Sequence, residues 1–85
     1  MTLDSDRTGA FVQRTWDASI VPALTDYVRI PAKSPAFDPA WREHGHIERA
    51  VALVEGWCRS RPIEGLRADV VHLEDRTPLI LVDVP

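Results

Sequence analysis

The stretch 78-PLILVDVP-85 decides how this sequence is interpreted. Its residues are typical of a β-strand, and Asp83 is the one acidic residue among them. A strand with one face in water alternates apolar and polar residues, whereas a strand that is covered on both faces is apolar throughout. This stretch is apolar on both faces, which predicts a strand from the interior of a sheet.

A second strand precedes this one. The segment 66-LRADVVHLE-74 also carries apolar residues on both faces, and the polar residues EDRTP that follow have the length of a hairpin connection. We therefore predict a β-hairpin with strands at 66–74 and 78–84. A two-stranded hairpin is only marginally stable in water, and an uncovered apolar edge promotes aggregation. The sequence thus predicts that further polypeptide covers this hairpin.

Helical periodicity dominates the sequence before the hairpin. Apolar residues recur about every four positions between Val12 and Val28, which predicts an amphipathic helix over residues 8–29. Pro22 removes one helical hydrogen bond inside this segment. The helix is therefore either kinked there or divided into two shorter helices, the second of which Ser19 would cap.

A proline-rich segment separates this helix from a second one. Three prolines within 30-IPAKSPAFDPA-40 predict an extended loop at residues 30–38. Asp38 followed by proline is a typical helix start, with Asp38 as the N-cap, and an apolar stripe then predicts a helix over residues 39–61. Because Gly45 weakens a helix, residues 39–45 either begin this helix or form a separate turn.

Composition limits the classes of protein to which the chain can belong. It has 85 residues, of which 45% are hydrophobic, and a formal net charge of −3. A chain of this length forms one small domain or part of a larger one, and its apolar content excludes a disordered chain. The acidic balance argues against nucleic acid and membranes as partners. A single cysteine, Cys58, and a polar N-terminal segment predict a cytoplasmic location.

We predict no catalytic residue, no cofactor-binding residue and no metal ligand in this chain. The histidines are His44, His46 and His72, and the first two would point in nearly opposite directions on a helix. Because a catalytic zinc site needs three converging ligands, we interpret them as helix-start and surface residues. Cys58 lies on an apolar helix face near a helix C-terminus, which disfavours a thiolate, and is interpreted as a core residue.

The remaining polar candidates also have structural interpretations. Lys33 and Ser34 lie in the proline-rich loop without an evident partner for nucleophilic chemistry. Residues 74–76 are interpreted as a solvated hairpin tip. Asp83 either faces solvent near the end of the sheet or supports a neighbouring ligand in a larger enzyme.

Three stretches of the chain resemble segments of a known enzyme family. They are SIVPALTDYVRIPAKSPAFDPAW (19–41), GHIERAVALVEGWCRSRPIEG (45–65) and VVHLEDRTPLILVDVP (70–85). In order and spacing they resemble the beginning of the carnosinase-like zinc metallopeptidases, peptidase family M-twenty. The resemblance implies that the chain is the N-terminal part, helices and then a β-hairpin, of a zinc-exopeptidase-like α/β/α sandwich.

The resemblance also implies an activity that these residues would not have alone. Family members hydrolyse dipeptides and N-acyl amino acids with two zinc ions, and their first zinc motif is Gly-His-x-Asp. Here Gly45 and His46 are followed by Ile47 and Glu48, so the motif's aspartate is missing, and the pair precedes the hairpin. We therefore expect residues 1–85 to be a single incomplete domain: an inactive scaffold, without zinc of its own, whose partner is the remainder of its own catalytic domain. Only the complete enzyme would bind the peptide substrate.

A function of a different class stays open. Without any further polypeptide, the predicted helices and hairpin would form a small α+β unit. Such a unit would serve as a non-catalytic protein-interaction module that forms a homodimer through its exposed strand edge.

Overall fold

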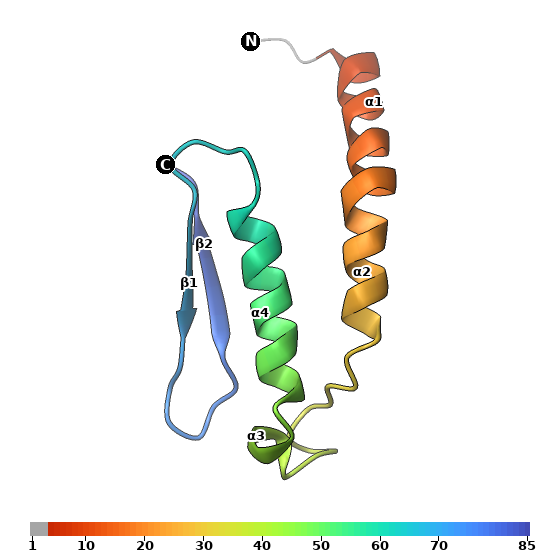
Figure 1. Cartoon of the computed structure of the whole chain (residues 1–85). Coiled ribbons are helices and arrows are strands. Elements are labelled where there is room, and N and C mark those ends of the chain that lie inside the picture. Colours follow the sequence, from red (N-terminus) through yellow and green to blue (C-terminus); the bar gives the residue numbers. More distant parts are fainter. Residues whose placement is uncertain (1–3) are drawn as a thin grey trace.

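The computed structural model describes residues 4–85 and consists of helices followed by a two-stranded antiparallel sheet (Figure 1). The chain is thus a small α+β unit. The helices are α1 (Ser5–Thr15), the π-helix η1 (Trp16–Ile20), α2 (Val21–Val28), α3 (Trp41–His44) and α4 (His46–Arg59), and the strands are β1 (Arg67–Val71) and β2 (Leu79–Asp83). Among the described residues, no helix is both long enough and apolar enough to cross a lipid bilayer.

The elements α1, η1 and α2 form one continuous helical arm (Figure 1). Its start differs from the predicted helix at 8–29, because Asp4 provides an N-cap. The Asp4 carboxylate accepts hydrogen bonds from the backbone N–H groups of Asp6 (3.0 Å) and Arg7 (3.1 Å). A capped N-terminus lets the polar first turn become helical although it carries no apolar stripe.

The π-helix η1 is the way in which the arm accommodates Pro22. Directly before this proline, the N–H of Val21 bonds to the carbonyl of Trp16, five residues earlier, so the turn is wider than an α-helical turn. The helix therefore continues past the position where Pro22 cannot donate a hydrogen bond. The alternative of two separate helices with a cap at Ser19 is wrong.

The segment predicted as one helix at 39–61 consists of two elements. Gly45 has a φ of +73°, in the left-handed region that favours glycine, and it separates α3 from α4. The structure therefore has a separate turn before the main helix, and α4 ends at Arg59 rather than at residue 61.

The strands pair in an antiparallel register, with Ala68 opposite Val82 and Val70 opposite Ile80, and α4 packs against both of them. Both strands are shorter than the predicted 66–74 and 78–84. Residues 72–78 form the connecting loop, in which Asp75 adopts a positive φ of 60°. A proline at position 78 cannot donate a hydrogen bond to the ladder, so pairing begins only at the next residue.

Little apolar surface is buried in this arrangement. Within residues 4–85 only Ala50 and Ala68 are buried. The radius of gyration is 16.1 Å, whereas a compact domain of this length has a value of about 12 Å. The difference arises because α1 contacts no described element except η1 and extends past the end of α4 (Figure 1).

The strand β2 is largely exposed to solvent although its sequence is apolar. Ile80 lies on the face that packs toward α4, where it lines a groove together with Ala50 and Val54. Leu79 and Leu81 alternate to the opposite face, and Leu81 is 52% exposed. The face of the hairpin that points away from α4 is therefore open to solvent.

Candidate functional site

Two of the three histidines lie close together at the junction of α3 and α4. The ring centroids of His44 and His46 are 5.7 Å apart, with an angle of 36° between the rings. The prediction that they point in opposite directions is wrong, because it assumed a continuous helix, and Gly45 interrupts the helix between them.

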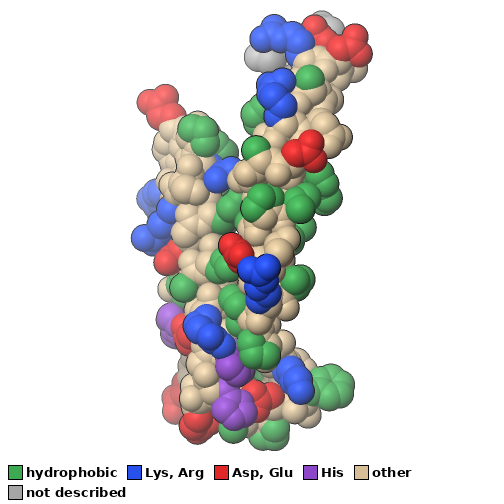
Figure 2. All heavy atoms as spheres, turned by 45° about the vertical axis from the view of Figure 1, so that its right-hand side comes forward, with side chains coloured by type: hydrophobic (Ala, Val, Ile, Leu, Met, Phe, Trp, Pro, Cys, Tyr) green, Lys and Arg blue, Asp and Glu red, His purple; other side chains and the backbone are tan. Residues whose placement is uncertain are grey.

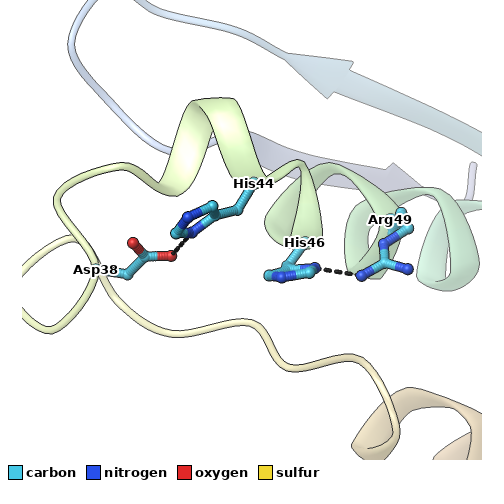
Figure 3. Close-up of polar contacts among 4 residues, drawn as sticks. All are labelled: Asp38, His44, His46 and Arg49. Carbon is cyan, nitrogen blue, oxygen red and sulfur yellow. Dashed lines mark hydrogen bonds and ion pairs between the residues drawn. The ribbon is translucent and has the colours of Figure 1, made fainter.

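Each of these rings is engaged by a different neighbour (Figure 3). His44 Nδ1 lies 2.7 Å from Oδ2 of Asp38, whose side chain is only 14% exposed. Arg49 donates a hydrogen bond to Nδ1 of His46. Asp38 was predicted to cap a helix, but its side chain instead holds His44 and thereby ties the proline-rich loop to α3.

The third histidine belongs to another part of the surface. His72 Nε2 lies 3.2 Å from a carboxylate oxygen of Glu48, and both side chains are exposed. This pair links the end of β1 to α4. In the part of the chain that the structure describes, no three His, Cys, Asp or Glu side chains come together in an arrangement that would hold a metal ion.

The other candidates of the sequence lie apart from one another. Cys58 is a half-buried free thiol on α4. Asp83 is exposed at the end of β2, opposite Arg67. Lys33 and Ser34 are both exposed in the proline-rich loop. The structure thus places none of these side chains beside a group that would activate it.

A polar cluster that the sequence analysis missed joins the arm to α4. Ser19 Oγ accepts hydrogen bonds from Nε1 of Trp57 (2.9 Å) and from Nη1 of Arg61 (3.0 Å). The Arg61 guanidinium lies over the Trp57 ring, 4.0 Å from its centroid, and its Nε donates to the Trp57 carbonyl. We call these three residues the Ser19 cluster. It fixes the separation of η1 and the C-terminal end of α4.

An apolar groove of about 330 Å³ runs between α2 and α4 below this cluster. Its lining includes Leu24 and Tyr27 from the arm and Leu53, Val54 and Trp57 from α4. We call it the α2–α4 groove. Figure 2 shows hydrophobic side chains gathered over this part of the molecule.

A second groove continues this apolar surface toward the sheet. It has a volume of about 220 Å³ and shares Tyr27 and Val54 with the first groove, but it also includes Ile80 of β2. Apolar surface therefore extends from the arm across α4 to the strand. Surfaces of this kind mark sites of association with other polypeptide.

The comparisons with known proteins give no assignment for this arrangement. No protein-family model matches the chain, and no curated protein matches it either.

Proposed function

We propose that this chain is a non-catalytic scaffold, the N-terminal part of a cytoplasmic, carnosinase-like zinc metallopeptidase. In this role the helices and the hairpin support the catalytic sheet of an α/β/α sandwich. The substrate of the complete enzyme would be a dipeptide or an N-acyl amino acid, as the resemblance to peptidase family M-twenty implies.

One observation carries this proposal: β2 is apolar on both faces, but α4 shelters only Ile80 on the near face, where Val82 is still 48% exposed, and no described residue covers the far face. Leu79 is 54% and Leu81 is 52% exposed, on the face away from α4. A sheet of an α/β/α sandwich has helices on both faces, and its inner strands are apolar throughout. The residues of β2 suit such an environment and are poorly suited to contact with water.

The backbone edges of the hairpin support the same role. Arg59 Nη2 donates a hydrogen bond to the carbonyl of Ala68 in β1, so a side chain occupies an acceptor of that strand. Among the described residues, β2 makes backbone hydrogen bonds only within the hairpin. A sheet can therefore be extended at β2, where unpaired backbone groups remain available.

The residues of this chain do not fit the two zinc ions that the resemblance implies. His44, His46 and His72 contact Asp38, Arg49 and Glu48, respectively, rather than one common point. The proposal therefore assigns both ions, the metal-bound water and the general base to other parts of the larger protein.

Sequencing the transcript that carries these 85 codons tests the proposal. We expect an in-frame Gly-His-x-Asp motif within a few dozen codons after Pro85, in a segment whose sequence predicts a further β-strand. A stop codon directly after Pro85 in the natural transcript would contradict the scaffold role.

A second candidate function is an interaction module that forms a homodimer through the edge of β2, and the availability of that edge favours it. A charged residue on an edge strand prevents such pairing. If this candidate is correct, Leu81→Lys abolishes self-association of the purified chain in sedimentation experiments. Retained association in this variant would exclude pairing through β2.

A further inference from the structure

We propose that Arg59 closes the outer edge of β1 to a further β-strand, so that an extended polypeptide segment joins this sheet only at β2. The closure of β1 goes beyond the proposed scaffold role and holds for the chain whether or not that role is correct. If the role is correct, β1 is the outermost strand of the larger sheet, and the next strand pairs with β2.

The register of the hairpin determines which backbone groups lie at its outer edges. In an antiparallel pair, residues that bond across to the partner strand alternate with residues whose N–H and C=O groups point outward. The last pair of the ladder is Val71 with Leu79. If this pair pointed outward, a backbone hydrogen bond would join the next two residues, His72 and Pro78, and the described residues include no such bond. Val71 therefore bonds across the hairpin, and Ala68, three residues earlier, points outward.

At the edge of β1, the side chain of Arg59 occupies the place that a further strand would take. Its Nη2 donates a hydrogen bond to the outward carbonyl of Ala68, at 2.8 Å. The same nitrogen lies 3.4 Å from a carboxylate oxygen of Glu55, one turn earlier in α4, and this ion pair holds the guanidinium in position. A strand that paired with β1 would have to displace Arg59 from both partners. Charged side chains at sheet edges prevent strand pairing in this way.

The outer edge of β2 has no such guard. Val70 shares the outward orientation of Ala68, so their partners across the ladder, Ile80 and Val82, point outward from β2. Among the described residues, the backbone of β2 bonds only within the hairpin, and Val82 is 48% exposed. An extended segment therefore finds free donors and acceptors at this edge. Since cross-strand neighbours pack side by side, a segment that pairs here should be apolar on both faces, as β2 is.

Sedimentation equilibrium of Arg59→Ala tests whether the β1 edge is closed. The substitution frees the carbonyl of Ala68 and gives the hairpin a second edge at which another copy of the chain can pair. One additional backbone hydrogen bond strengthens association by a factor of about 5. Because the guanidinium also no longer obstructs the edge, we expect Arg59→Ala to associate about 10-fold more strongly than the wild type, or more. At low concentration, circular dichroism should show the helix and sheet content of the wild type.

A second substitution in the same background identifies the surface. Val70→Pro removes the outward N–H of residue 70 and spares the hydrogen bonds between β1 and β2, as prolines on edge strands do. Association of the double variant should therefore return to the level of the wild type. Two controls keep Arg59 in place and should also associate as the wild type does. Arg7→Ala makes the same change of charge at an exposed residue of α1, and Ser19→Ala disturbs the Ser19 cluster.

The outcomes separate closure of β1 from the other proposals. An Arg59→Ala variant that associates no more strongly than the wild type would overturn the inference. Stronger association that Val70→Pro does not reverse, or that either control reproduces, would also overturn it, because pairing would then not run through the edge of β1. The association of the wild type itself tests pairing through β2, so the two ideas can fail independently.

Discussion

Removing the hydroxyl of Ser19 tests whether the Ser19 cluster holds the arm against α4. In Ser19→Ala, the indole N–H of Trp57 and one N–H of Arg61 lose their acceptor. Both donors are partly buried in this cluster. An unsatisfied donor costs about 1–3 kcal/mol when fully buried, so we expect the free energy of unfolding to fall by about 1–2 kcal/mol.

Urea unfolding followed by far-ultraviolet circular dichroism measures this loss. For a chain of this size the dependence of the free energy on urea is about 1 kcal/mol per molar, so the midpoint should fall by about 1–2 M. All variants must be compared at one protein concentration, because association makes the midpoint concentration-dependent. Ser34→Ala is the matched control, since it removes the same hydroxyl from an exposed residue of the proline-rich loop, outside the Ser19 cluster.

A double-mutant cycle separates the hydrogen bond from other effects of the substitution. Trp57→Phe removes the indole donor, and in that background Ser19→Ala should cost clearly less than in the wild type. The reasoning is refuted if Ser19→Ala unfolds at the same urea concentration as Ser34→Ala, or if the two substitutions are strictly additive.

Three further substitutions probe how local backbone chemistry shapes the helices. Gly45→Ala should destabilise the chain by about 1–2 kcal/mol in urea unfolding, because residue 45 needs a left-handed conformation. Gly56→Ala should instead stabilise it by about 0.4–1 kcal/mol, since Gly56 lies inside α4 and an added Cβ meets no atom within 4 Å. Asp4→Ala should speed hydrogen exchange of the α1 amides while leaving the free energy of unfolding within about 0.5 kcal/mol of the wild type, because the lost cap acts on a helix that packs only on η1. An unchanged exchange rate in α1 would show that the Asp4 cap is not needed.

Periodicity and turn chemistry predicted the types of the elements because both act locally. The apolar stripes of the arm and of α4, and the hairpin, are visible in the sequence as repeats of about four and of two residues. The ends of the elements were harder to predict. The start of α1 depends on a cap at Asp4 rather than on a stripe, and the arm passes Pro22 by forming a π turn, for which we know no sequence signal.

The side-chain contacts were less predictable because they depend on tertiary geometry. Trp57 and Ser19 are 38 positions apart, and each has an ordinary local explanation, one as an apolar helix residue and the other as a cap. Asp38 illustrates the same limit, because its typical cap position did not reveal that His44 would lie 2.7 Å away. The proximity of His44 and His46 followed only once Gly45 was seen to break the helix.

The proposed scaffold role begins from the exposure of β2, and the unfolding free energy of Leu81→Lys tests that exposure most directly. Because Leu81 is 52% exposed on the open face, we expect this variant to unfold within about 1 kcal/mol of the wild type. Ala68→Lys, at the buried position of β1, should lose about 3 kcal/mol or fail to fold. A loss of about 3 kcal/mol in Leu81→Lys as well would show that this strand is covered within the chain and would contradict the account.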